Sequence, residues 1–224
     1  MGKVCIIIPA FNEELSIGEV IFQSKKYGDI IVVDDGSTDK TIEVSKKYGA
    51  IVIYSKINMG YDKTVLKGIN YALDKDYNYI LIIDADGQHP SKSIPKFIHY
   101  IKKKKYNVVI GNRNYYPRLS EKIFNYYSNK FYSIPDVLCG MKCYNADFLK
   151  DCDHNKYINS IGTYYLFKAV SRNLKVKVIN ITVRNRQFNS SKMGLSFIAN
   201  FTVFKAFIKI LLYNLISFKG NNEK

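Results

Sequence analysis

The fold is decided by residues 4–39, which read VCIIIPAFNEELSIGEVIFQSKKYGDIIVVDDGSTD. Two apolar runs, Val4–Pro9 and Asp29–Asp34, flank an amphipathic segment at about Glu14–Tyr27. Runs that are apolar at consecutive positions are typical of parallel strands covered on both faces. The stretch therefore predicts a strand, a helix and a second, parallel strand.

The same alternation continues along the N-terminal half. We expect further strands at Ala50–Tyr54, Tyr79–Asp84 and Asn107–Gly111, and helices at Lys40–Tyr48, Asp62–Asp74 and Ser91–Lys104. Alternation of this length predicts a Rossmann-like, doubly wound α/β fold with a mostly parallel sheet.

The second half of the chain is less regular. We expect helices at Ser120–Tyr132 and Gly162–Arg172, a turn-rich stretch at Pro135–Asn145 and a strand at Lys175–Val183. No linker or repeat separates the two halves. We therefore predict one domain over residues 1–193, and an amphipathic helix over residues 194–218 within it or appended to it.

Composition narrows the class of protein. Of the 224 residues, 47% are hydrophobic and 24% are charged, which excludes a disordered or fibrous chain. The net charge of +15 is concentrated late in the sequence, because residues 154–222 hold eleven Lys or Arg and no Asp or Glu. We interpret this acid-free region as an attachment surface for nucleic acid, an acidic membrane face or a phosphorylated substrate.

The cysteines indicate a reducing environment. Cys5, Cys139, Cys143 and Cys152 form no C-x-x-C pair, and only three histidines accompany them. Zinc spacings are therefore missing, and without a signal peptide we expect free thiols in the cytosol. The sequence also lacks the ~20 uninterrupted apolar residues of a clean transmembrane helix.

Three of the predicted strands run directly into polar clusters, at Pro9–Glu13, Asp34–Asp39 and Asp84–His89. In open α/β sheets the ligand lies outside the carboxyl ends of the strands. We therefore expect the three clusters to face one crevice.

Each cluster has a second, purely structural interpretation. Asp84 and Asp86 would repel each other unless neutralised, and their oxygens suit Mg²⁺ or Mn²⁺, but Asp86-Gly87 also fits a turn before a helix. Likewise, the Asp34–Asp39 cluster could make a turn and a helix cap, and Glu13 could be a first-turn acid. Since a G-x-G-x-x-G fingerprint and a Walker A motif are missing, hydride transfer and P-loop hydrolysis are not leading ideas.

Four ordered motifs then carry a family resemblance: Ile8-Pro-Ala-Phe-Asn-Glu-Glu14, Val32-Val-Asp-Asp-Gly-Ser-Thr-Asp39, Asn58-Met-Gly60 with Gly68 and Ala72, and Asp84-Ala-Asp-Gly-Gln-His-Pro90. Together they resemble family 2 glycosyltransferases of the GT-A fold. The Gln-His-Pro after D-x-D resembles the branch of dolichyl-phosphate mannose synthase and other polyprenyl-phosphate glycosyltransferases. Weaker matches follow at Gly111-Asn-Arg113, Asp136-Val-Leu-Cys-Gly140 and Arg186-Gln-Phe-Asn-Ser-Ser-Lys192, with Cys139 and Asn189 standing where the family usually has Ser and Gly.

The resemblance implies a role for each matching residue. The base and ribose of a GDP- or UDP-sugar would be held by Pro9, Phe11, Glu13, Val33 and Asp35. The diphosphate and its Mg²⁺ or Mn²⁺ would be held by Asp84, Ala85, Asp86 and Gln88, with Asp86 and Gln88 as metal ligands. Donor or acceptor phosphates would meet Arg113, Arg118, Arg186 and Lys192, with Cys139 also at the acceptor site. Asp86, Arg113, Arg118 and Asp136 form the predicted catalytic set.

The acceptor is inferred from what inverting transfer requires. A metal stabilises the diphosphate leaving group, and a hydroxyl acceptor also needs a general base. The acid-free region 154–222 offers none, whereas a polyprenyl phosphate is already an anion. We therefore expect a metal-dependent hexosyltransferase that moves mannose or glucose to a polyprenyl phosphate, with Asp136 as the alternative base for a sugar or protein hydroxyl.

The predicted helix at residues 194–218 indicates where in the cell the enzyme acts. Lys205 and Lys209 share one helix face, so this segment either lies on an anionic membrane or packs into the core. We expect peripheral attachment at the cytoplasmic face, with a membrane partner subunit where attachment alone is insufficient. A basic nucleic-acid-binding protein is the remaining alternative, and we expect no nucleic-acid partner because the aromatics form no RNA-binding motif.

Overall fold

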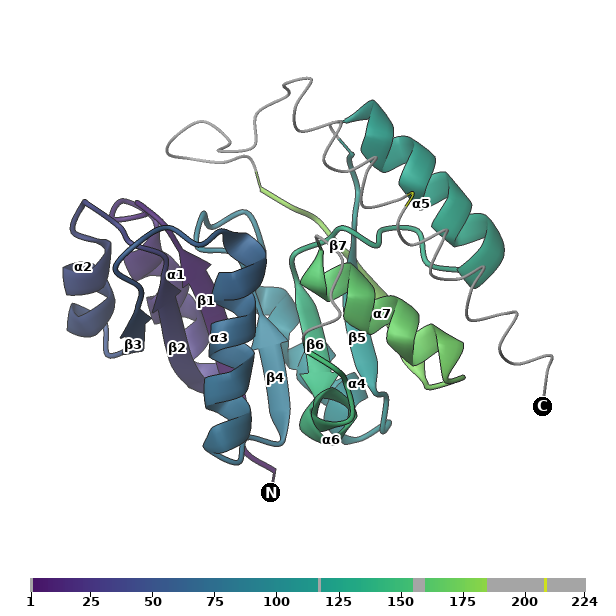
Figure 1. Cartoon of the computed structure of the whole chain (residues 1–224), viewed down its shortest axis with the longest axis horizontal. Coiled ribbons are helices and arrows are strands. Elements are labelled where there is room, and N and C mark those ends of the chain that lie inside the picture. Colours follow the sequence, from purple (N-terminus) through teal and green to yellow (C-terminus); the bar gives the residue numbers. More distant parts are fainter. Residues whose placement is uncertain (1, 117, 155–159, 185–207, 209–224) are drawn as a thin grey trace.

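The computed structural model describes residues 2–116, 118–154, 160–184 and 208 (Figure 1). One seven-stranded sheet has the order β3-β2-β1-β4-β6-β5-β7. Its strands are β1 (Val4–Ala10), β2 (Asp29–Asp34), β3 (Ile51–Tyr54), β4 (Tyr79–Ile82), β5 (Val108–Arg113), β6 (Lys142–Asn145) and β7 (Val176–Ile181). The helices are α1 (Ile17–Ser24), α2 (Thr41–Lys47), α3 (Tyr61–Asp74), α4 (Ile94–Lys102), α5 (Leu119–Tyr132), α6 (Ala146–Lys150) and α7 (Ile161–Ser171), with single 3-10 turns at Lys25–Tyr27 and Ser91–Ser93.

The predicted strand–helix–strand unit is confirmed. β1 pairs in parallel with β2 on one side and with β4 on the other. In Figure 1, α3 and α7 lie in front of the sheet while α1 and α4 lie behind it. Both faces are thus covered, which explains why these strands are apolar at consecutive positions.

Gly68 shows how closely α3 approaches the sheet. A Cβ at this position would lie 2.7 Å from Ile7 Cγ2 and 2.9 Å from Val33 Cγ2. Only glycine allows this packing, so its place in the sequence motif has a structural reason.

The second half differs from the prediction at one strand. The stretch expected to be turn-rich ends in β6, which runs antiparallel between β4 and β5. Lys142, Cys143 and Tyr144 of this strand are all buried. Four residues that begin with a lysine and end with an asparagine carry no strand periodicity, and tertiary pairing decided their conformation.

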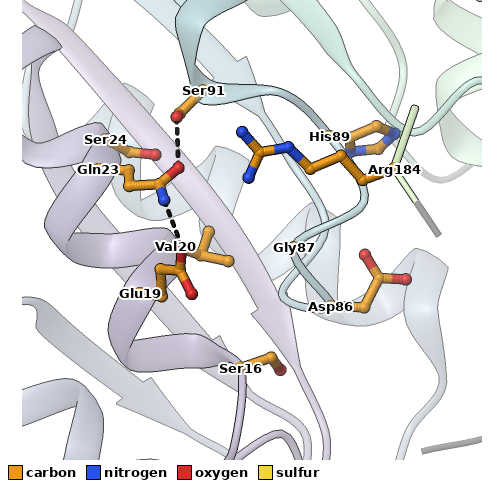
Figure 2. Close-up of a pocket in the computed structure, with 10 residues that line it drawn as sticks. All are labelled: Ser16, Glu19, Val20, Gln23, Ser24, Asp86, Gly87, His89, Ser91 and Arg184. Atoms are coloured by element: carbon orange, nitrogen blue, oxygen red, sulfur yellow. Dashed lines mark hydrogen bonds between the residues drawn. The ribbon is translucent and has the colours of Figure 1, made fainter. Parts of the chain in front are cut away.

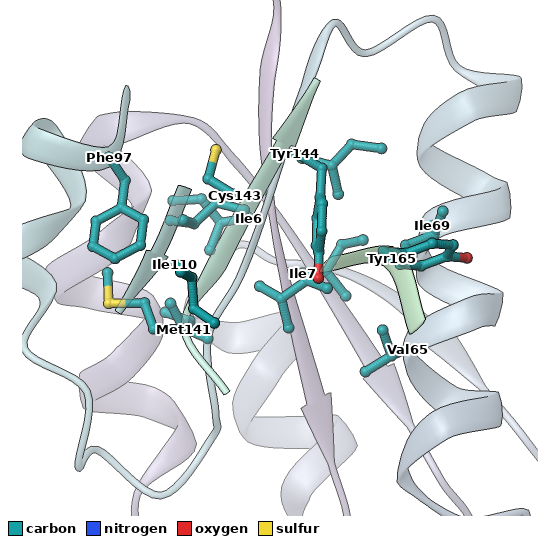
Figure 3. Packing of buried hydrophobic residues seen from close by; sticks show 14 of the residues in the cluster. Ile6, Ile7, Val65, Ile69, Phe97, Ile110, Met141, Cys143, Tyr144 and Tyr165 are labelled. Atoms are coloured by element: carbon teal, nitrogen blue, oxygen red, sulfur yellow. The ribbon is translucent and has the colours of Figure 1, made fainter. Parts of the chain in front are cut away.

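The core lies on both sides of β1, β4 and β6. Figure 3 shows Tyr144 and Tyr165 next to Ile69 and Val65 of α3, and Phe97 beside Met141 and Ile110. All four cysteines are free, as expected, and all four are buried. Within the described residues, no helix combines the length and the apolar character needed to cross a membrane. The helix expected at 194–218 lies outside the described residues, apart from Ile208.

Candidate active site

The two acids at the end of β2 are held in different ways. Asp34 is fully buried, and its Oδ1 accepts the backbone N–H groups of Gly36 at 3.2 Å and Ser37 at 3.0 Å. Gly36 has a φ of +80°, a conformation that glycine adopts without strain. Asp34 therefore shapes the turn, which is the structural interpretation of this cluster.

Asp35 reaches across to the loop before α3. Its Oδ1 accepts the backbone N–H of Met59 at 2.8 Å, and its Oδ2 accepts that of Gly60 at 2.9 Å. Two sequence motifs, at residues 32–39 and 58–60, are thereby joined at one point. Asp35 lies at the carboxyl end of β2, where the crevice was predicted. Contact between Asp35 and a nucleotide stays a prediction.

The other predicted donor residues lie at the same edge. Pro9 and Val33 are direct neighbours in the parallel pair of β1 and β2, and Phe11 follows β1. Glu13 is buried; its Oε2 accepts the hydroxyl of Ser16 at 2.9 Å, and its backbone N–H donates to Thr41 Oγ1 at 2.8 Å. These contacts tie the start of α1 to α2.

Asp84 follows β4 and is fixed from three sides. Its Oδ1 accepts the Tyr61 hydroxyl at 3.1 Å, and its backbone N–H donates to His89 Nδ1 at 3.1 Å. A Cβ at Gly140 would collide with Asp84 Oδ2. The first acid of D-x-D therefore packs against the Asp136–Gly140 motif, and this close approach requires glycine at position 140.

Asp86 and Gln88 lie on the turn beyond Ala85, which is buried. Asp86 Oδ1 accepts the Gln88 backbone N–H at 3.0 Å. Gln88 also contacts the segment after β7. Its side-chain Nε2 donates to the backbone carbonyl of Arg184 at 3.2 Å, and its backbone carbonyl accepts the Arg184 N–H at 3.0 Å. Figure 2 shows Asp86, His89 and Arg184 around a cleft bordered on the far side by α1.

The oxygen atoms of Asp86 and Gln88 fit a hard divalent cation. The Asp86 carboxylate and the Gln88 side-chain carbonyl are oxygen ligands of the kind that Mg²⁺ and Mn²⁺ take. The described residues contain no group of three or more His, Cys, Asp and Glu side chains that could enclose a metal by themselves. Mg²⁺ is usually held by one or two carboxylates together with substrate phosphates, so the residues fit a metal that is shared with a diphosphate.

A second cluster lies at the end of β5, where Arg113 meets Asp136. Arg113 Nε donates to Asp136 Oδ2 at 2.7 Å, and its terminal nitrogen donates to Asp136 Oδ1 at 2.9 Å. The Arg113 backbone N–H donates to the same carboxylate at 3.0 Å. Both oxygens of the fully buried Asp136 are thus engaged by one residue.

Glu121 extends this cluster to Arg118, and neither its burial nor its role was predicted. The Glu121 side chain is 2% exposed; it accepts a bond from Arg113 at 3.2 Å and pairs with Arg118. The only signal in the sequence was the spacing of Arg118 and Glu121, which are three residues apart at the start of a helix.

Lys142 is a further buried cation that the sequence did not indicate. Its Nζ donates to the carbonyl of Cys139, and a Cβ at Gly162 would lie 3.0 Å from that Nζ. Burial lowers the pKa of Lys142, an effect that the Asp136 carboxylate partly opposes. Burial also raises the pKa of the Cys139 thiol to about 12, so this position carries a neutral, weakly polar group.

The comparison with protein families shows which family the chain belongs to. Residues 5–174 match the family described as "Glycosyl transferase family 2". The chain belongs to this family. This match confirms the family resemblance that the motifs predicted.

Relatives of this family 2 chain that carry named activities include two transferases. One is a UDP-N-acetylglucosamine–dolichyl-phosphate N-acetylglucosaminyltransferase of Methanococcus voltae, which is 28% identical over 66% of this chain and 71% of its own length. The other is an undecaprenyl-phosphate mannosyltransferase of Micrococcus luteus, which is 23% identical over 86% of this chain and 88% of its own length.

The solved structures support the GT-A architecture of this glycosyltransferase. The glucosyl-3-phosphoglycerate synthase of Mycobacterium tuberculosis, determined in complex with Mn²⁺, UDP and glucosyl-3-phosphoglycerate, superposes with a TM-score of 0.69 at 15% identity. The match covers 84% of this chain and 73% of the synthase.

Of the predicted site residues, Arg186 and Lys192 lie outside the described residues.

Proposed function

We propose that this glycosyltransferase moves a sugar from a nucleotide-sugar donor to a polyprenyl phosphate, with inversion at the anomeric carbon. The observation that carries the proposal is the arginine clamp on Asp136. Arg113 occupies both Asp136 oxygens, and Glu121 is occupied by Arg113 and Arg118. The carboxylates of Asp136 and Glu121 therefore orient the arginine side chains.

That arrangement suits an anionic nucleophile. A sugar hydroxyl must lose its proton to a base within hydrogen-bond reach, and a carboxylate that accepts a two-pronged arginine is poorly placed to take it. A lipid phosphate needs no base, and it is bound best by arginines held in a fixed orientation. The relatives from M. voltae and M. luteus, which are named for dolichyl- and undecaprenyl-phosphate activities, support this acceptor class.

We place the donor diphosphate at the D-x-D turn. Asp86 and Gln88 would hold Mg²⁺ or Mn²⁺, and the metal, when bound, neutralises charge that develops on the leaving diphosphate. Asp84, braced by Tyr61 and packed on Gly140, would orient the sugar-phosphate end of the donor. Pro9, Phe11, Glu13, Val33 and Asp35 would hold the base and ribose.

We propose mannose or glucose as the donor sugar. N-acetylglucosamine is a third sugar to be tested, because the M. voltae relative is named for its transfer. We propose that the enzyme acts at the cytoplasmic face of a membrane, where its acceptor resides. The net charge of +15 supports attraction to an anionic surface.

The test is a transfer assay with radiolabelled GDP-mannose, UDP-glucose and UDP-N-acetylglucosamine, each with Mn²⁺ or EDTA. The acceptors are a short-chain polyprenyl phosphate, the matching polyprenol and a soluble sugar. We expect label on the polyprenyl phosphate only, and none in EDTA. Transfer to the polyprenol or the soluble sugar would instead favour a hydroxyl acceptor, and Asp136 would then be tested as its base. Full activity in EDTA would overturn the metal proposal.

A further inference from the structure

The outward side of α5 has an unusual composition. Leu119 is 69% exposed and Tyr126 is 71% exposed, and Ile123 and Phe131 are also exposed. The remaining exposed residues of the helix are Lys122, Asn129 and Lys130. Leu119, Ile123 and Tyr126 are spaced four and three residues apart, so they form one continuous stripe on the helix.

No acid interrupts this face within the described helix. Glu121 is the one acidic residue of α5, and it is buried against Arg113 and Arg118. By contrast, α3, which has the same length, exposes Lys63, Asn70 and Asp74 along its outer side, with Tyr61 as its one exposed aromatic residue. A helix that carries apolar, aromatic and lysine side chains without acids is typical of an amphipathic segment at a bilayer surface.

The apolar stripe begins at the acceptor side of the candidate active site. Arg118 immediately precedes α5 and pairs with Glu121, which also binds Arg113. Tyr115, which is also exposed, lies just before it. A polyprenyl phosphate is anchored in a bilayer by its polyprenyl chain. Its phosphate would reach Arg113 and Arg118 from a bilayer that lies against the adjoining face of α5.

We infer that the outward face of α5 docks on an anionic lipid bilayer, with Leu119, Ile123 and Tyr126 in the headgroup–acyl boundary and Lys122 and Lys130 at the lipid phosphates. This inference rests on the proposed function, because it names the surface through which the same site meets its acceptor. Charge complementarity selects the occupant. A second copy docked through the same face would offer these lysines no exposed acid of α5, whereas anionic lipid neutralises them.

The test measures sedimentation of the full-length protein with vesicles, without any substrate. Vesicles of pure phosphatidylcholine are compared with equimolar phosphatidylcholine and phosphatidylglycerol. We expect binding to the anionic vesicles, and a loss of about tenfold or more in Leu119→Ser/Tyr126→Ser because two apolar side chains no longer enter the lipid. Lys122→Glu/Lys130→Glu should lose binding to the anionic vesicles in particular.

The matched control is Phe22→Ser on α1, at the opposite end of the molecule (Figure 1). Phe22 is 62% exposed, so the change removes one exposed apolar side chain away from α5, and vesicle binding should not change. Thermal unfolding checks that all variants fold. Because vesicle binding is measured without donor or acceptor, it separates this inference from the proposed reaction, which the polyprenyl phosphate assay tests in detergent.

Three results would overturn the inference. Unchanged vesicle binding in both α5 variants would exclude this face. A wild-type dimer that Leu119→Ser/Tyr126→Ser converts to a monomer, with vesicle binding retained, would assign the face to a second copy. Loss of thermal stability in that variant with vesicle binding retained would assign it to another segment of this chain, such as residues 194–218.

Discussion

The two sides of the candidate active site hold their acids by different means. At the ends of β2 and β4, the carboxylates of Asp34, Asp35 and Asp86 accept backbone N–H groups. At the end of β5, Asp136 and Glu121 accept charged arginine side chains. A backbone donor is kept in every substitution except proline and carries no net charge, whereas each arginine–carboxylate pair joins a buried acid to a partly buried arginine, and the two side chains depend on each other.

This difference separates the expected consequences of mutation. Removing a donor-side acid should change ligand binding and catalysis while the fold persists. Removing an acid from the Arg113–Asp136–Glu121 cluster leaves Arg113 with one carboxylate partner in place of two, so stability should fall as well. The predictions below test this contrast, beginning with the largest effect.

The largest effect is expected for Asp136→Asn. Arg113 would then lack the anion that it binds through three nitrogen donors. Breaking a buried pair by removing one partner typically costs about 3–5 kcal/mol, and chemical denaturation measures this loss. Asp74→Asn, at an exposed position of α3, serves as the control. A variant as stable as the wild type would show that the clamp does not stabilise the fold.

Asp86→Ala should reduce transfer by about a hundredfold or more, because it removes a ligand of the charge-neutralising metal. The free energy of unfolding should fall by only about 1 kcal/mol, because the half-buried side chain contributes a hydrogen bond from the Gln88 N–H. Steady-state kinetics with Mn²⁺ and a denaturation curve check both halves. Undiminished turnover would remove Asp86 from the metal site.

Asp35→Ala should weaken nucleotide binding by roughly 1–3 kcal/mol, the cost of leaving hydrogen-bonding groups without a partner. The Met59 N–H would lose Asp35 as its acceptor and the Gly60 N–H would keep only Asn58 Oδ1, so the loop at residues 58–60 would be held less firmly. Titration calorimetry with GDP and UDP measures the change. An unchanged dissociation constant would restrict Asp35 to a structural role.

The smallest effect concerns Lys142 and pH. Because burial lowers the pKa of Lys142 in the folded protein, the unfolded chain binds more protons between that pKa and the ordinary lysine value. Stability therefore rises with pH across this interval, and wild type should gain relative to Lys142→Met as the pH approaches that of free lysine. Denaturation of both proteins over a pH series measures the difference. A constant difference would show that Lys142 is not perturbed.

Much of the fold could be predicted because its signals are local. The apolar runs at Val4–Pro9 and Asp29–Asp34 become β1 and β2 almost residue for residue, and the family motifs at the strand ends indicated the glycosyltransferase. Burial on both faces leaves a direct mark on the sequence of a parallel strand. β6 left no such mark, since its four residues owe their conformation to pairing with β4 and β5.

The sequence by itself determined which residues stand at the carboxyl ends of the strands, because strand length and turn chemistry are encoded by neighbouring residues. Tertiary structure alone decided that Asp34 shapes a turn while adjacent Asp35 reaches Gly60, and that Arg113 clamps Asp136, 23 positions away. It also decided that Lys142 is buried and that α5 presents Leu119 and Tyr126 to the outside. These outcomes depend on which groups are brought together and removed from water, and that property belongs to the folded chain as a whole.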